Sequence, residues 1–335
     1  MKTLKQKRIL ISRPDRIGDV VLSTPMPREI KLEYPDSYLV MLVRKYTADI
    51  FKNNPFVDDL ILIDDEKSYY KKLFEIRQHN FNYALMLLPN EKINYMLFLA
   101  GINTRIGVGH KFYQFITNVK SVYRNKYIPL RHEADYCMDL ARKIGVETDN
   151  LKTEIYLTGE EIQSSKKKKK ELLDGKKFLI GVHSTSGNSA PNWTSENYRK
   201  LIDELISFDD YKIAITDNDI PDELRNIPEV IYPNTNSDLR SSIVNFSTLD
   251  VLISASTGPM HIAAALDVKT VSLFCPLTAC SPKLWGPSGN KQKIILPEEN
   301  YCQNKCPGDP KLCRLEGEGG IDKDMVIANL RSILT

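Results

Sequence analysis

Residues 13–20 combine two arginines, a glycine and two aspartates that could together do chemistry. They read Arg-Pro-Asp-Arg-Ile-Gly-Asp-Val and directly follow an apolar run at residues 8–12. The glycine permits a tight turn, which would bring the Asp19 carboxylate to the edge of a sheet. There it could accept the proton of a hydroxyl group that attacks an electrophilic carbon. Asp19 could instead cap the following helix, a common role for such an aspartate.

The same stretch carries Arg13 and Arg16. Paired arginines suit an anionic ligand, because a guanidinium group binds carboxylate or phosphate oxygens in a fork. We therefore predict that these two residues bind an anionic acceptor, such as a carboxylated sugar or a lipid phosphate. The alternative is that they are ordinary surface arginines.

A second stretch, residues 254–261, follows an apolar strand and opens an alanine-rich helix. The backbone amides, the threonine hydroxyl and the helix dipole of such a turn suit a pyrophosphate group. It is not a Walker A loop, because the GxxxxGK pattern is absent. Its histidine could equally be a packed, hydrogen-bonded core residue. The predicted ligand-binding residues here are Ser256, Thr257, Gly258, Pro259, Met260 and His261.

Two weaker signals follow other predicted strands. Ser184, Thr185, Ser186 and Gly187 could wrap a phosphate or a ribose, although such clusters are usually plain loops. Residues 217–219 read Asp-Asn-Asp, a spacing that can hold Mg²⁺ against a diphosphate. The alternatives are a turn, or a hydrogen bond from Asp219 to the ribose of a nucleotide.

Five of the six cysteines lie late in the chain: Cys275, Cys280, Cys302, Cys306 and Cys313. In a reducing cytosol we expect free thiols rather than disulfides. Cys280 and the last three could form a four-thiolate metal site, but their spacing differs from the usual zinc CxxC pairs.

Short β-branched runs alternate with amphipathic stretches, a pattern that predicts parallel sheets covered by helices on both faces. The length of 335 residues predicts about two domains with a cleft between them. We place a first domain at residues 1–157, a linker at 158–176, a second domain at 177–320 and a final helix at 321–335. Strands are predicted at residues 8–12, 38–43, 60–63, 83–88, 178–183, 211–216, 251–254 and 270–275, and Thr194 is the predicted N-cap of a helix over 195–206.

The net charge of +3, against 46 basic and 43 acidic residues, gives no indication of nucleic-acid binding. The sequence also lacks a signal peptide and an apolar window of about 20 residues that could span a bilayer. We therefore expect a cytoplasmic protein. The lysine run at residues 166–170 is either a solvated helix face or a contact with a membrane surface.

Four stretches together resemble glycosyltransferase family 9, the heptosyltransferase-like enzymes of lipopolysaccharide core synthesis. They are residues 16–25, 105–107, 257–266 and 284–287, in the family's order and spacing. The resemblance implies a GT-B fold, in which two Rossmann-like, doubly wound α/β domains face a central cleft. It also implies an inverting mechanism without an obligatory metal or cofactor, Asp19 as the catalytic base, and a donor held mainly by the C-terminal domain.

The implied partners are a nucleotide-sugar donor, ADP-heptose or similar, and a lipid-linked glycan acceptor at the inner face of the membrane. The thiols are then dispensable for catalysis, because this chemistry needs no metal.

Two departures from the family pattern leave alternatives open. Ser256 stands where the family has aspartate, and Pro191 where it has lysine; Lys283 and Arg16 are candidate substitutes for the lost charge. The protein could use another nucleotide-hexose donor, or it could bind nucleotide-sugars without turnover. A dehydrogenase is disfavoured, since no predicted strand is followed by GxGxxG.

Overall fold

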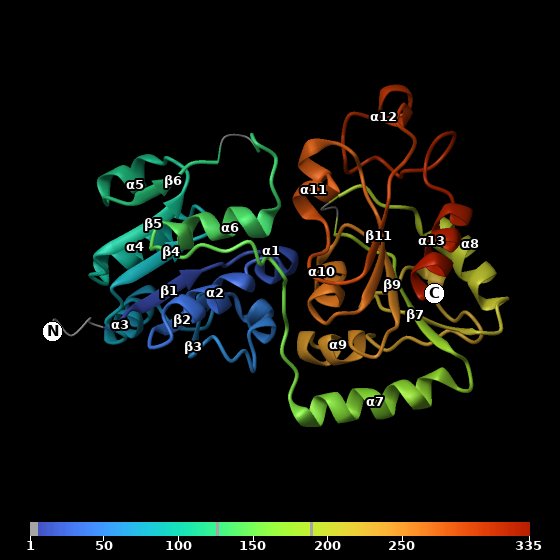
Figure 1. The fold of residues 1–335 in the computed structure, drawn as a ribbon, viewed down its shortest axis with the longest axis horizontal. Helices are drawn as coiled ribbons and strands as arrows, with labels where there is room; N and C mark the ends of the chain where they lie inside the picture. The colour runs from blue at the N-terminus through green and yellow to red at the C-terminus, as the bar shows by residue number, and fades with distance from the viewer. Residues whose placement is uncertain (1–5, 125–126, 188–189) are drawn as a thin grey trace. The chain divides into compact units, whose positions relative to one another are not determined.

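The computed structural model describes residues 6–124, 127–187 and 190–335. The chain forms two compact units, Met1–Leu151 and Lys152–Thr335, and each is a parallel sheet with covering helices (Figure 1). The chain passes from one unit to the other once.

The first unit contains a six-stranded parallel sheet in the order β3-β2-β1-β4-β5-β6. This order reverses between β1 and β4, which is the point where ligands bind in doubly wound folds. The inner strands are apolar on both faces, as expected when helices cover both sides of a parallel sheet. The strands are β1 (Arg8–Ser12), β2 (Tyr38–Val43), β3 (Asp59–Leu62), β4 (Tyr83–Met86), β5 (Thr104–Val108) and β6 (Lys120–Val122).

Short helices connect these strands. They are α1 (Ile17–Val21), α2 (Pro25–Glu33), the 3-10 helix η1 (Lys45–Ile50), α3 (Tyr69–Gln78), α4 (Glu91–Leu99), α5 (Phe112–Ile116) and α6 (Glu133–Arg142). All neighbouring strands run parallel, so the carboxyl ends of the strands share one edge of the sheet.

The second unit repeats the scheme with a five-stranded parallel sheet in the order β11-β10-β9-β7-β8. Here the strand order reverses between β7 and β9, which gives this unit its own switch point. The strands are β7 (Phe178–His183), β8 (Tyr211–Ile215), β9 (Val251–Ala255), β10 (Lys269–Leu273) and β11 (Gln292–Ile295).

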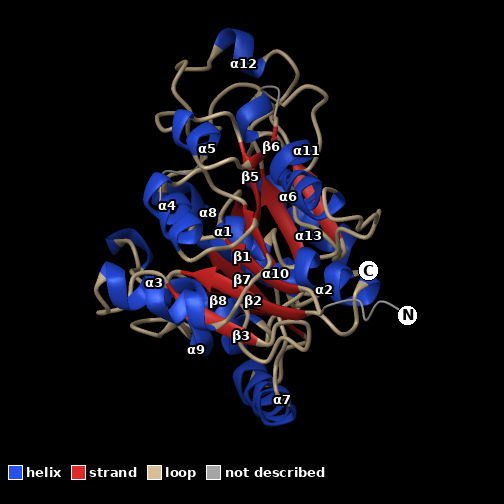
Figure 2. Cartoon of the chain, turned by 90° about the vertical axis from the view of Figure 1, so that its left-hand side faces the viewer, coloured by secondary structure: helices blue, strands red, loops and turns tan. Residues whose placement is uncertain are grey.

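The helices of the second unit are α7 (Gly159–Leu173), α8 (Ser195–Ile206), α9 (Leu239–Phe246), α10 (Gly258–Ala265), α11 (Pro282–Trp285), α12 (Tyr301–Asn304) and α13 (Lys323–Leu334), with 3-10 turns η2 (Asp222–Leu224) and η3 (Thr278–Cys280). Figure 2 shows the red strands flanked by blue helices. The two doubly wound α/β units confirm the predicted fold class.

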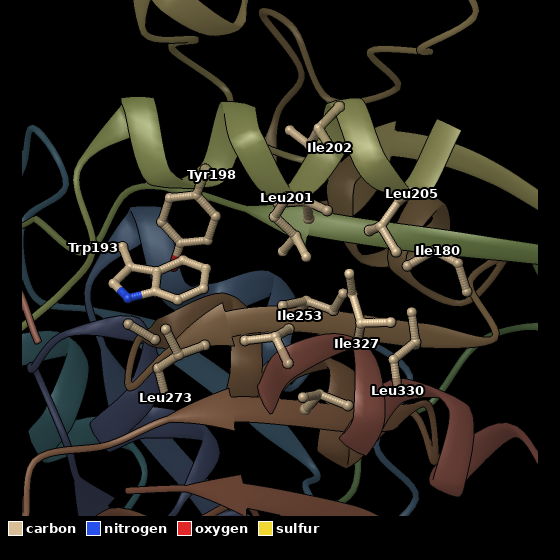
Figure 3. Packing of buried hydrophobic residues seen from close by; sticks show 14 of the residues in the cluster. Ile180, Trp193, Tyr198, Leu201, Ile202, Leu205, Ile253, Leu273, Ile327 and Leu330 are labelled. Carbon is tan, nitrogen blue, oxygen red and sulfur yellow. The ribbon is translucent and has the colours of Figure 1, made fainter. Parts of the chain in front are cut away.

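Helix α8 shows how the sequence builds this core. Thr194 caps it by accepting a hydrogen bond from the Asn197 N–H, as predicted. Its buried residues recur at the spacing of one helix face and pack against the sheet and α13. In Figure 3 the aromatic pair Trp193 and Tyr198 lies next to Leu201, and Leu205 follows farther along the same helix. Ile253 and Leu273 lie on the strands below them.

Residues 158–176, predicted as a linker, contain the whole of helix α7 and belong to the second unit. A capping box between Thr158 and Glu161 starts the helix, and Arg240 of α9 binds the Glu161 carboxylate at 2.6 Å. The structure therefore divides the chain after Leu151. Within the part of the chain described, no helix is long and apolar enough to cross a membrane.

Candidate active site and donor-binding loops

Asp19 lies in the loop and first helix that follow β1, at the switch point of the first unit. It is the third residue of α1. The N-cap of this helix is Arg16, whose side chain makes no capping hydrogen bond. The Asp19 Oδ1 accepts a hydrogen bond from the Arg13 Nη2 at 2.8 Å, and the side chain keeps 22% of its surface exposed. Asp19 is therefore not the N-cap of α1. The carboxylate is held by an arginine and still reaches solvent.

Arg13 lies almost fully buried behind Asp19, with 2% of its side chain exposed. Its guanidinium donates to the backbone oxygens of Asp19 (3.2 Å) and Leu87 (3.3 Å) and to the Glu133 Oε1 (3.2 Å). Glu133 is itself buried and accepts two hydrogen bonds of 2.9 Å from Arg124. The guanidinium N–H groups of Arg13 therefore donate to acceptors within the protein, and these hydrogen bonds hold the Asp19 carboxylate in a fixed orientation. Arg16, by contrast, is exposed at the start of α1.

Burial raises the pKa of Asp19 to about 6, and the attraction of Arg13 only partly opposes this. The position of Asp19 near a helix N-terminus alone would lower its pKa. Desolvation outweighs that effect because most of the carboxylate is removed from water. Asp19 is therefore a carboxylate at neutral pH, but close enough to its pKa to exchange a proton readily.

In the second unit, the loops after β7 and β9 lie side by side, since His183 pairs with Ser254 in register. The predicted donor residues Ser184–Gly187 and Ser256–His261 are therefore brought to one edge of the sheet. Thr257 is the N-cap of α10 but makes no side-chain cap hydrogen bond, and Gly258 and Pro259 are partly exposed. This leaves the start of α10 accessible to an anion. The other predicted residues of this stretch are buried: Ser256, Thr257, Met260 and His261.

The two aspartates at residues 217–219 differ in burial. Asp217 is fully buried and accepts hydrogen bonds from the N–H and hydroxyl groups of both Ser184 and Thr185, at 2.7–3.2 Å. Asp219 is fully exposed and lies 3.6 Å from Arg225. A metal held by both carboxylates does not fit this geometry. Asp217 instead fixes the shape of the Ser184–Gly187 loop.

A pocket of about 520 Å³ opens beside that loop. Its polar wall comes from the loop and from the start of α8, and Arg314 lines it from a distant part of the sequence. The lining residues are Ser184, Thr185, Ser186, Gly187, Asn192, Trp193, Thr194, Ser195, Glu196, Pro221 and Arg314.

The five late cysteines form a cluster that we call the thiol cluster: Cys275, Cys280, Cys302, Cys306 and Cys313. All are free thiols. The Cys275 thiol interacts with the thiols of Cys280 and Cys302. Its hydrogen bond with Cys280 lowers the pKa of the Cys280 thiol to about 7. Among the residues that the structure describes, no group of three or more His, Cys, Asp or Glu side chains is arranged to hold a metal ion.

Sequence reasoning missed four functional candidates: Glu133, Arg124, Asp217 as a loop anchor, and Arg314. Glu133 contacts Arg13 from 120 positions away along the chain, and Arg124 in turn contacts Glu133. A single sequence does not reveal such contacts. Arg314 directly follows Cys313 in the cysteine-rich segment, and no motif distinguishes it from an ordinary surface arginine.

Taken together, the two doubly wound α/β units define a GT-B-like fold, the class of many glycosyltransferases. Residues 71–312 match the profile of glycosyltransferase family 9 (heptosyltransferase), and the chain belongs to this family. It is a heptosyltransferase-like glycosyltransferase, as the resemblance implied.

Among curated proteins, the chain is 26% identical over 307 residues to a putative glycosyltransferase of Haemophilus influenzae, covering 86% of this chain and 88% of that one. Among solved structures, it is similar to a family 9 glycosyltransferase of Veillonella parvula, with a TM-score of 0.79, 20% identity and 98% and 97% of the two chains covered. It is also similar to the ADP-heptose lipopolysaccharide heptosyltransferase II of Escherichia coli, with a TM-score of 0.74, 17% identity and 98% of both chains covered.

Proposed function

We propose that this enzyme transfers a sugar, heptose or a relative, from a nucleoside-diphosphate donor to a lipopolysaccharide-core or related lipid-linked glycan. The observation that carries the proposal is Asp19, a solvent-reaching carboxylate held by Arg13 at the switch point of the first unit.

In the proposed reaction, an acceptor hydroxyl oxygen attacks the anomeric carbon of the donor sugar. The bond from that carbon to the diphosphate oxygen breaks, and the diphosphate leaves with the bonding electrons. The hydroxyl proton passes to a carboxylate oxygen of Asp19. Attack from the face opposite to the leaving group inverts the anomeric centre, and no metal enters these steps.

The donor diphosphate is proposed to lie against the start of α10, held mostly by backbone N–H groups near Gly258. The exposed Asp219 is the proposed partner of the ribose. An ADP-heptose-like donor is supported by the name of the Escherichia coli relative. Because Ser256 and Pro191 depart from the family pattern, another nucleotide-hexose is the second candidate donor.

The acceptor is proposed to bind the first unit through Arg16, which is exposed beside Asp19. Arg13 contributes by orienting the base, because its donors are already bound to protein groups. A peripheral contact with the cytoplasmic membrane face would use the lysine-rich helix α7. Two of its five lysines, Lys168 and Lys169, bind Asn245 and Asp250 at 2.6 Å, so the other three are the ones proposed to meet lipid.

The test begins with thermal unfolding of the wild-type protein in the presence of ADP, UDP, GDP and CDP. A ligand at about 100 times its Kd should stabilise the protein by about 2.7 kcal/mol, so the donor base would stand out. The matching nucleotide-heptose and nucleotide-hexoses are then offered with a lipid-linked core acceptor, and the product anomer is determined by NMR. Nucleotide binding without any transfer would favour a binding protein, and a retained anomer would contradict the mechanism.

A further inference from the structure

We infer that Arg314 supplies the positive charge that binds a phosphate group of the nucleotide donor. The inference rests on the proposed function, because it assigns the charged partner of the donor that the loops of the second unit are proposed to hold. It starts from the pocket of about 520 Å³ beside the Ser184–Gly187 loop, a volume within the range of small-molecule sites.

Arg314 is the positively charged residue among the described residues that line this pocket, and Glu196 is the negatively charged one. The Glu196 carboxylate is held at the start of α8 by its own backbone N–H and the Thr194 hydroxyl. One nitrogen of Arg314, Nη1, donates to the backbone oxygen of Lys311 at 3.2 Å. Within the described part of the chain no carboxylate forms an ion pair with Arg314, so its charge is available to a ligand.

Other polar groups of the pocket wall are already used by the protein. The hydroxyl and N–H groups of both Ser184 and Thr185 donate hydrogen bonds to the buried Asp217 carboxylate. The Asn192 amide donates to the backbone oxygen of Ser184 at 2.6 Å. Arg314 therefore offers the charged donors that remain, and a guanidinium suits the planar pair of oxygens on a phosphate.

The backbone around Arg314 is fixed while the side chain is exposed. Its neighbours Cys313 and Leu315 are buried in the core of the second unit, with 4% and 0% of their surfaces exposed. The Leu315 oxygen accepts from the Ile321 N–H at 2.7 Å, and the Ile321 oxygen accepts from the Trp193 Nε1 at 3.0 Å. Because Trp193 also lines the pocket, the same bonds tie the Arg314 backbone to the pocket wall.

The pocket also lies at the correct edge of the sheet. The loop after β7 forms its wall, and this loop lies beside the loop after β9 that leads into α10. A donor with one phosphate at the start of α10 and another towards Arg314 would cross the carboxyl ends of adjacent strands. This is the usual binding place in open α/β sheets.

The test measures ADP, AMP and adenosine binding by calorimetry to the full-length wild type, Arg314→Ala, Arg314→Lys and Lys311→Ala. Lys311→Ala is the matched control, because it removes a nearby positive charge in the same segment but does not line the pocket. We expect Arg314→Ala to lower ADP affinity at least tenfold, with Arg314→Lys between it and the wild type. Adenosine affinity should be unchanged, since adenosine has no phosphate, and Lys311→Ala should bind as wild type.

Equal losses for ADP and adenosine would mean that the substitution damages the site as a whole, which would overturn the inference. Unchanged ADP binding by Arg314→Ala would also overturn it while leaving the proposed function standing. If the wild type binds none of ADP, UDP, GDP and CDP, the proposed function itself fails. If another diphosphate binds instead of ADP, the same series is run with that nucleotide, its monophosphate and its nucleoside.

Discussion

The carboxylate of Asp19 can be removed without changing the size of the side chain. Asp19→Asn keeps an oxygen for the Arg13 hydrogen bond, but asparagine cannot accept a proton at neutral pH. General-base assistance is worth about 100- to 10,000-fold, so we expect turnover to fall by about that factor with donor affinity nearly unchanged. Steady-state kinetics with a binding measurement checks this. The control is Asp15→Asn, the same change in the same loop, which should keep most of the activity. Turnover above about a tenth of wild type in Asp19→Asn would exclude Asp19 as the base.

The same substitution makes a prediction about stability. Because the pKa of Asp19 in the folded protein is raised to about 6, above its ordinary value, the folded state binds the proton more tightly than the unfolded chain. The resulting stability is present at low pH and is lost as pH rises through about 6. Asp19→Asn should therefore be no less stable than wild type at pH 8, by urea unfolding. A clear loss of stability would show that the carboxylate is needed for folding.

The raised pKa also predicts how activity depends on pH. A general base works only as the carboxylate, so kcat/KM should fall as pH decreases through about 6. The pH dependence of kcat/KM is the correct measure, because it reports the pKa values of catalytic groups in the free enzyme. An acid limb near the ordinary aspartate value of about 4 would contradict the buried setting of Asp19 or its role as the base.

At the scale of elements, the start of helix α10 should decide nucleotide binding. Gly258→Val places a branched side chain over the backbone amides proposed to hold the diphosphate, so ADP affinity should fall at least tenfold, or about 1.4 kcal/mol. The control is Gly159→Val at the first residue of α7, where an added Cβ meets open space. Calorimetry should find wild-type ADP binding in the control. If Gly258→Val binds ADP as tightly as the control, the diphosphate lies elsewhere.

Eight of the eleven described strands were predicted from the sequence, whereas three were not. The predicted bounds of β1, β2 and β7 agree with the structure, because strands buried on both faces leave continuous apolar runs. The strands β5, β6 and β11 were missed: β6 has only three residues, and only the last residue of β11 is buried. At the site, sequence spacing located Asp19 but could not separate the buried Asp217 from the exposed Asp219. That difference depends on loops that meet only in the folded chain.

For the whole molecule, the loops proposed to bind the donor all belong to the second unit. The core around Ile180 and Leu330 lies in the second unit, and the core around Leu10 and Val40 lies in the first. We therefore expect ADP to slow amide hydrogen exchange mainly within residues 152–335. Mass spectrometry of the full-length protein with and without ADP measures this, and AMP serves as a weaker ligand for comparison. Protection concentrated in residues 6–124 would contradict a donor site in the second unit.

The single passage of the chain between its units, after Leu151, also bears on how such genes diversify. One recombination event at the codons for Leu151 and Lys152 would exchange the entire unit that we propose to bind the donor, and it would leave the described strands of both sheets intact. In a protein whose chain crossed repeatedly between its units, the same exchange would need several breakpoints. Donor and acceptor preferences could therefore be inherited separately, and laboratory chimaeras joined at this position would be the natural way to recombine them.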